Sequence, residues 1–254
     1  RNQLPKESFV VIIGALAPHL ANPACPPVTV SYIAHCLERL LTVRDRAADG
    51  SRTPRLNKED IAPCLSGLLT GFFAALDRED MAENEYVMKC IMRVIATLEG
   101  QVASIAGACM QPLSEKLLAV AKNPINSNFN HFLFEAVAAL IHFSTKTDPA
   151  LLGQLEKSVF PVIQVVLQED IEDFAPYVFQ IMAQLVQLHT APLPEVYTSL
   201  FTPLLNPVLW ERSGNVPGLV HLLQAYLGKA AMSQQQVLGI LGVFQKLIAS
   251  KTLE

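Results

Sequence analysis

The stretch Asn84-Glu85-Tyr86-Val87-Met88 has a counterpart 46 residues later, Asn130-His131-Phe132-Leu133-Phe134, and this recurrence decides the fold. Between and around the two copies, apolar residues recur at helical spacing, and no long stretch alternates with a period of two. Glycine, proline and asparagine break the pattern at short, regular intervals, as they do between helices. The sequence therefore predicts an all-α protein that is built from repeated helical units.

Four prolines mark the same period, because each lies inside the first helix of a predicted helix pair. They are spaced 49, 49 and 42 residues apart and are Pro63, Pro112, Pro161 and Pro203. A helical repeat of about 40–47 residues is typical of HEAT and armadillo arrays, whereas tetratricopeptide and ankyrin repeats are shorter. A proline at this place is expected to kink the helix.

We therefore predict one HEAT-repeat solenoid over residues 1–254, with about five and a half helix pairs. The predicted pairs cover residues 6–46 (helices 6–20 and 29–46), 58–98 (58–76 and 84–98), 102–145 (102–122 and 128–145), 150–189 (150–169 and 174–189) and 194–227 (194–210 and 216–227). A final helix covers residues 233–250. Each pair would bury its apolar face against the pairs before and after it, so that partners would bind along an extended surface.

The composition agrees with stacked helices and excludes several classes of protein. Hydrophobic residues make up 51% of the 254 residues, charged residues 17%, and the net charge is −4. Disordered chains are poorer in apolar residues, and nucleic-acid binding requires a basic surplus. The longest apolar runs, Phe9–Leu20 and Leu133–Phe143, are interrupted, and neither reaches the roughly 18–20 residues of a membrane span. We therefore expect no membrane span and no nucleic-acid partner.

The five cysteines form no C-x-x-C motif, which argues against a disulfide framework or a zinc site. We expect most of them to be buried in a reducing compartment. The chain begins at Arg1 without a signal-peptide pattern, so we expect a segment of a longer protein.

No residues form a recognisable catalytic, metal-binding or cofactor-binding pattern. The six histidines are scattered over different helices without an H-E-x-x-H motif, and no G-x-S-x-G motif follows a strand. Gly239 and Gly242 lack the preceding strand of a phosphate loop, so close helix packing explains them better. We expect a protein that is not an enzyme and holds no metal or cofactor.

Two charged segments have alternative interpretations. The acidic run Glu169–Asp173 precedes Pro176, which favours a helix cap over a contact with a basic partner. The polar segment Arg44–Asp60 favours a solvated, mobile loop, and the alternative is a modifiable or partner-contacting loop.

Five residues are candidates for partner binding. Glu85, Lys89 and Arg93 recur every four residues and form a polar stripe on a predicted second helix. Arg212 and Asn215 lie in the turn after the only tryptophan, Trp210. Tryptophan and arginine are enriched at interfaces, although Trp210 fits a core position equally well.

Several long strings resemble one family over essentially the whole chain. They are Glu83–Lys89, Lys116–Pro124, Phe129–Ala136, Pro207–Arg212 and Leu241–Lys251. Together they resemble nuclear export receptors of the importin-beta-type karyopherin family. The resemblance implies a HEAT solenoid from the middle of a longer receptor that moves between nucleus and cytoplasm. It also implies binding of importin-alpha together with GTP-bound Ran, with the GTP held by Ran. The alternative is a generic HEAT scaffold of a multiprotein complex.

Overall fold

The computed structural model describes residues 4–229 and 232–251. Of the individual residues named above, Arg1 lies outside this part of the chain. The chain divides into two compact units, Arg1–Ser158 and Val159–Glu254, and each unit is described separately. The fold class is all-α, of the HEAT-repeat solenoid type, with one short β-hairpin among the described residues. The prediction of a single solenoid over residues 1–254 stays a prediction.

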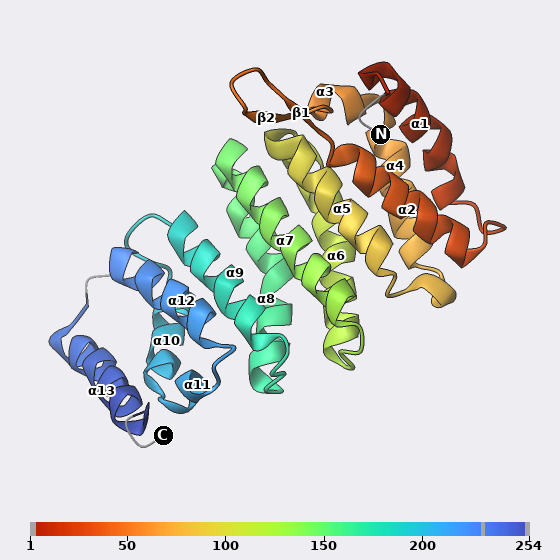
Figure 1. Ribbon diagram of the computed structural model, residues 1–254. Coiled ribbons are helices and arrows are strands. Elements are labelled where there is room, and N and C mark those ends of the chain that lie inside the picture. The colour runs from red at the N-terminus through yellow and green to blue at the C-terminus, as the bar shows by residue number, and fades with distance from the viewer. Residues whose placement is uncertain (1–3, 230–231, 252–254) are drawn as a thin grey trace. The chain divides into compact units, whose positions relative to one another are not determined.

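The first unit consists of two layers of helices (Figure 1). One layer contains α2 (Pro27–Leu41), α5 (Glu85–Leu98) and α7 (Ser127–Thr147), in which α5 packs against both neighbours. The other contains α1 (Lys6–Leu20), α4 (Leu65–Leu76) and α6 (Ala106–Ala121). The Lys116 ammonium of α6 donates to the carbonyl of Leu76 at the end of α4, 2.6 Å away. The apolar stripes of both layers face each other and form the core.

Two asparagines start the second helices of successive repeats in the same way. The Asn84 side chain accepts a hydrogen bond from the amide of Val87, and the Asn126 side chain accepts one from Phe129. Each side chain also donates to the preceding repeat, Asn84 to the Ser31 hydroxyl and Asn126 to the Glu83 carbonyl. One residue thus caps a helix and joins it to its neighbour.

The structural register differs from the recurrence seen in the sequence by one helical turn. Asn130, which matches Asn84 in sequence, lies inside α7 and is buried. The cap equivalent to Asn84 is Asn126, four residues earlier. Residues four apart lie on the same helix face, so the apolar pattern looks alike in both registers.

The four prolines of the predicted repeat have two different environments. Pro112 lies inside α6, and Pro161 lies inside α8 (Leu152–Gln168), as predicted. Pro63 instead lies in the 3₁₀ turn Ala62–Cys64, and Pro203 lies in the 3₁₀ turn Thr202–Leu205. The missing amide hydrogen and the bulk of the ring break the helix at these two positions.

The second unit is built around the packing of α9 (Ala175–Leu188) against α12 (Val216–Lys229). A side chain at Gly218 would place its Cβ 2.8 Å from the carbonyl oxygen of Pro176, so glycine allows this close approach. The region predicted as one helix over 194–210 is instead divided. Its parts are α10 (Glu195–Phe201), the 3₁₀ turn Thr202–Leu205 and α11 (Val208–Glu211).

The last helix, α13 (Gln234–Lys251), tests the prediction of close packing at its two glycines. A Cβ at Gly239 would lie 2.8 Å from the Leu205 side chain, so the prediction is confirmed there. At Gly242 a Cβ would meet no atom within 4 Å, so the prediction is wrong at that position.

The polar segment Arg44–Asp60 is more ordered than predicted. The helix predicted over 29–46 ends at Leu41, and β1 (Arg44–Arg46) pairs in antiparallel register with β2 (Arg52–Pro54). The short helix α3 (Lys58–Ile61) follows and is closed by reciprocal hydrogen bonds between Asn57 and Asp60. The interpretation as an irregular loop is therefore wrong for these strands and this helix, whereas most of the segment is exposed, as expected of a solvated one.

Three helical stretches are long and apolar enough to cross a membrane, by length and composition only. They are Lys58–Leu76, Glu85–Ala121 and Pro149–Gln168. The expectation of no membrane span was based on uninterrupted apolar runs, and this criterion was too strict. A stretch can reach the mean hydropathy of a membrane span although it contains single polar residues. In the fold, α5 packs between α2 and α7, and this packing accounts for its apolar residues.

The cysteines are free thiols in three kinds of environment. Cys25, Cys90 and Cys109 are buried, Cys64 is half-buried, and Cys36 is exposed. Burial raises the pKa of the Cys109 thiol to about 11, so this thiol is neutral at physiological pH. The expectation of buried cysteines is therefore confirmed for three of them.

Candidate protein-binding surface

The predicted polar stripe lies on the face of α5 opposite its core residues. The core face carries Val87, Ile91, Val94 and Leu98, all of which are fully buried. Glu85, Lys89 and Arg93 are half-buried, because the neighbouring helices α2 and α7 flank them. The stripe therefore belongs to the outer face of the α2–α5–α7 layer.

Two of the three stripe residues contact a neighbouring helix. The Lys89 ammonium lies 5.3 Å from the ring centroid of Phe132 in α7, as in a cation–π contact. The Arg93 Nε–H donates to Glu38 Oε1 in α2 at 3.4 Å. The stripe thus joins the three helices, and its predicted role in partner binding stays a prediction.

Aromatic side chains on the same face were missed by the sequence analysis. Tyr32 on α2 is 71% exposed and Tyr86 on α5 is 43% exposed. The Tyr86 ring packs edge-on against His35, with ring centroids 5.7 Å apart. Exposed tyrosines beside cationic residues are typical of protein interfaces. Tyr32 and His35 are three residues apart, so they share one face of α2. This spacing was the signal in the sequence that could have revealed the aromatic side chains.

The Glu38 carboxylate is the most deeply buried charged group of this layer. Its side chain is only 2% exposed, and Arg93 is its ion-pair partner. Its second oxygen, Oε2, has no hydrogen-bond partner in the described part of the chain. Because burying an unpaired charge is unfavourable, Arg93 has a structural role in addition to its predicted role.

A hollow of about 510 Å³ lies between the base of the hairpin and the last turns of α5. Its charged lining residues are three cations and two anions: Arg44, Lys58, Arg93, Glu59 and Glu99. Thr42, Thr97 and Asn57 add neutral hydrogen-bonding groups. The hollow therefore extends the stripe toward the hairpin and has a small excess of positive charge.

In the second unit, Arg212 forms ion pairs within the chain. Its guanidinium donates to both oxygens of Asp170, at 2.6 and 2.7 Å, and lies 3.0 Å from Glu172. The hydrogen bond from Arg212 holds the pKa of the Asp170 carboxyl below its usual range. This arginine therefore connects the turn before α9 to the turn before α12.

Asn215, which the sequence offered as a partner-binding candidate in the turn after Trp210, is buried. Only 2% of it is exposed, and its Nδ2–H donates to the carbonyl of Leu209 at 3.1 Å. Trp210 is also buried and donates its indole N–H to the carbonyl of Leu204 at 2.8 Å. Both side chains thus close the turn around α11, and Asn215 is not available for direct contact.

The acidic run before α9 does not cap that helix with a side chain. The residue at the cap position is Phe174, which forms no side-chain capping bond, whereas Pro176 lies in the first turn as predicted. Asp170 and Glu172 bind Arg212 instead. The prediction of a cap is therefore wrong, because Phe174 and not an acidic residue stands at the cap position.

Histidine, cysteine, aspartate and glutamate side chains form no group of three that could hold a metal ion in residues 4–229 and 232–251. The α2–α5–α7 face presents aromatic and cationic groups, which are suited to recognition.

Comparisons with known proteins extend over nearly the whole chain. A family model described as "CAS/CSE protein, C-terminus" matches residues 38–254. Exportin-2 of Mus musculus and exportin-2 of Homo sapiens are each 43% identical, and that of Danio rerio is 42% identical. Each alignment covers 99% of this chain and 26% of the relative. The chain therefore spans about a quarter of the length of these relatives.

A solved structure described as "The exportin Cse1 in its cargo-free, cytoplasmic state" has a similar fold. Its TM-score is 0.78 and its sequence identity is 32%, and the match covers 99% of this chain and 25% of that chain. The family model, the identity to exportin-2 and the shared all-α architecture agree. The chain belongs to the CAS/CSE family of exportins, and it corresponds to a segment of these nuclear export receptors.

Proposed function

We propose that this chain forms part of a receptor that binds importin-alpha together with GTP-bound Ran and returns importin-alpha to the cytoplasm. The observation that carries the proposal is the identity of 41–43% to exportin-2 along 99% of the chain. A receptor with this role moves between nucleus and cytoplasm, and its chemistry is binding rather than catalysis.

The α2–α5–α7 face supplies groups that suit such a role. Tyr32 and Tyr86 expose rigid aromatic surface, and Lys89 adds a positive charge held over Phe132. Aromatic and cationic residues contribute most to binding energy at many protein interfaces. We assign partner contacts in the first unit to this face.

A chimaera tests the proposal in the setting of a whole receptor. In exportin-2 of Danio rerio, the matching quarter is replaced by this chain, and the chimaera is immobilised. Importin-alpha is then added with Ran loaded with GTP or with GDP. We expect capture of importin-alpha with the GTP form and little capture with the GDP form.

A folded chimaera that captures importin-alpha equally with both nucleotides would contradict the proposal and favour a generic HEAT scaffold. A Tyr86→Ala plus Lys89→Ala chimaera examines the assigned face, and we expect capture to fall by about tenfold or more. The matched control is Tyr177→Ala plus Lys157→Ala, two changes of the same kind on other helices. Equal losses in both variants would contradict the assignment of this face.

Localisation provides an independent test. A fluorescent chimaera is expected in both nucleus and cytoplasm, with exchange between them after photobleaching of one compartment. A chimaera confined to one compartment would contradict a shuttling receptor.

A further inference from the structure

The β-hairpin of the first unit places three arginines on one of its faces. In the antiparallel register Arg46 lies opposite Arg52, and Arg44 lies opposite Pro54. Side chains of directly opposed residues, and of residues two apart on a strand, share a face. Arg44, Arg46 and Arg52 therefore form one cationic face, which we call the arginine face.

The three guanidinium groups are exposed and have no partner of opposite charge. None of them takes part in a hydrogen bond or an ion pair in residues 4–229 and 232–251. Like charges directly opposite each other destabilise a strand pair, so the Arg46–Arg52 pair is locally unfavourable. A bound anion would remove this repulsion.

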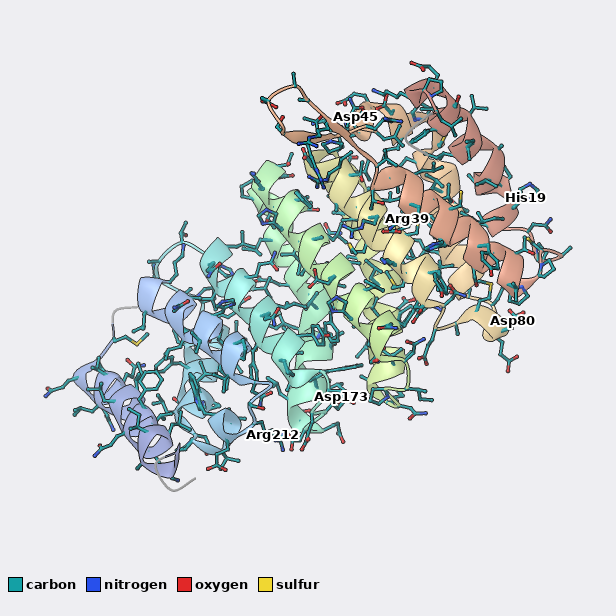
Figure 2. The ribbon with its side chains drawn as sticks, viewed as in Figure 1. His19, Arg39, Asp45, Asp80, Asp173 and Arg212 are labelled. Carbon is teal, nitrogen blue, oxygen red and sulfur yellow. The ribbon has the colours of Figure 1, made fainter. Side chains whose placement is uncertain are left out.

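Both carboxylates of the hairpin are bound elsewhere. Asp45 points to the other face, where it accepts hydrogen bonds from Arg55, and Figure 2 marks its place beside the hairpin. Asp49 accepts the backbone N–H of Ser51 at 2.8 Å inside the turn. The hydrogen bond from Arg55 lowers the pKa of the Asp45 carboxyl, and hydrogen bonds from the Ser51 side chain and then its backbone lower that of Asp49. Both carboxylates therefore stay ionised yet leave the arginine face uncompensated.

The hairpin is held firmly against the first unit, so that its arginines have a defined position. Arg55, directly after β2, donates to Asp45 and to the carbonyl of Leu4, and its guanidinium lies 5.3 Å from the Phe9 ring centroid. Gly50, with φ of +85°, allows the tight turn between the strands. A preordered surface loses less conformational entropy on binding than a mobile loop.

Positive charge continues from the arginine face into the hollow at the base of the hairpin. Arg44 belongs to both, and Lys58 and Arg93 line the hollow with it. Glu59 and Glu99 also line the hollow and offset part of this charge. The combined surface carries five cations and two anions, and one of the cations, Arg93, is already paired with the buried Glu38 carboxylate.

We infer that this surface binds an extended, acidic segment of a partner protein. Arg44 and Arg46 are two residues apart on a strand, which places their side chains about 6.6 Å apart. Alternate carboxylates of an extended peptide have the same spacing, and guanidinium forks bind carboxylates in a bidentate manner. A nucleic acid is the poorer fit, because the chain as a whole has a net charge of −4.

The inference goes beyond the proposed function, and its test needs neither importin-alpha nor Ran. The probe is a fluorescein-labelled peptide of alternating glutamate and threonine, and binding is measured by fluorescence anisotropy. A peptide with glutamine in place of glutamate is the neutral control. We expect the chain to bind the acidic peptide, to ignore the neutral one and to release the acidic one as salt rises.

Two double variants test whether the arginine face is responsible for binding. Arg46→Ser plus Arg52→Ser is expected to weaken binding by about tenfold or more, because two charge-assisted contacts are lost. Lys122→Ser plus Lys157→Ser removes the same charge from exposed sites elsewhere in the first unit, and we expect a change below about twofold. Circular dichroism and thermal unfolding verify that both variants fold.

Three results would overturn the inference. The first is equal weakening by both variants, which indicates non-specific attraction. The second is the absence of binding to the acidic peptide at low salt. The third is tighter binding of a single-stranded oligothymidine that is lost in the Arg46→Ser plus Arg52→Ser variant, which assigns the face to a nucleic acid.

Discussion

The hairpin of the first unit and the turn before α12 both carry arginine, and they differ in how its charge is used. Arg212 is engaged within the chain by Asp170 and Glu172, which come from a turn about 40 residues earlier. Arg44, Arg46 and Arg52 share one face of the hairpin and have no such partner in the part of the chain that the structure describes. An arginine in a turn is therefore a binding candidate only where the fold leaves its charge uncompensated.

The largest expected effect concerns the structural role of the Arg212 turn. Trp210→Ala should lower the free energy of unfolding by about 3–5 kcal/mol, because it leaves a cavity. It also removes the edge-on contact with Phe244, at 5.7 Å between centroids, and the bond to the Leu204 carbonyl. Urea unfolding followed by circular dichroism measures the loss.

Trp210→Phe is the control for that measurement, since it keeps much of the packing but loses the N–H donor and part of the ring volume. We expect it to lower stability by about 1–2 kcal/mol. A Trp210→Ala chain as stable as the Phe variant would contradict a core role for this tryptophan.

The next largest effect concerns the structural role of Arg93, as distinct from its predicted role in partner binding. Arg93→Ala should lower the free energy of unfolding by about 1–3 kcal/mol, because it leaves the buried Glu38 carboxylate without its cation. Adding Glu38→Gln should recover part of the loss, since the remaining side chain is neutral. If the two substitutions destabilise additively, Arg93 does not compensate the charge of Glu38.

The rate of tryptic cleavage in the hairpin tests whether the contacts of Arg55 stabilise it. Arg55→Ala removes the bonds to Asp45 and Leu4 and the contact with Phe9. Trypsin should then cleave after Arg46 or Arg52 about tenfold faster, because local opening becomes easier. Mass spectrometry of a timed digest identifies the sites.

Arg212→Ala is the control for the digest, and it should leave the cleavage rate in the hairpin unchanged. Equal rates in wild type and Arg55→Ala would show that the hairpin is held by other contacts.

The smallest effect is expected at the exposed Arg212 ion pairs themselves. Arg212→Ala should lower the melting temperature by no more than about 2 °C, because exposed ion pairs contribute little. The native pKa of Asp170 lies below its usual value of 3.8. Its contribution is therefore present above that pH and is lost as the pH falls through the lowered native pKa.

Thermal unfolding of wild type and Arg212→Ala at a series of pH values tests this sign. The difference in melting temperature should shrink in acid, and Asp170→Asn should remove most of it at neutral pH. A difference that grows on acidification would contradict the ion pair as its source.

The sequence predicted helices well where apolar spacing was continuous, and less well where proline or polar residues intervened. The helix predicted over 84–98 is α5 within one residue, whereas the helix predicted over 194–210 is three pieces. The apolar pattern aligned Asn84 with Asn130, whereas the structural equivalent of Asn84 is Asn126, one helical turn earlier. Residues four apart share a helix face, so the two registers look alike in the sequence. The capping residues Asn84 and Asn126, rather than the recurrence in the sequence, determine where α5 and α7 begin.

The candidate site could be predicted only in part. Glu85, Lys89 and Arg93 stand out by their four-residue spacing, which is a local property of one helix. Their contacts with Phe132 and Glu38 come from other helices, and no local pattern indicates them. Asn215 looked like an exposed turn residue, yet its amide satisfies the Leu209 carbonyl in the interior.

By itself the sequence determined the helical class, the repeat period and the family, because these depend on spacing and on strings of residues. Tertiary structure alone decided which charges are paired, since Arg212 meets Asp170 across 42 residues and Arg93 meets Glu38 across 55. It also decided that the arginine face exists, because the strand register, not the order of residues, brings Arg46 beside Arg52. Charge compensation acts through space, and a linear pattern does not contain those distances.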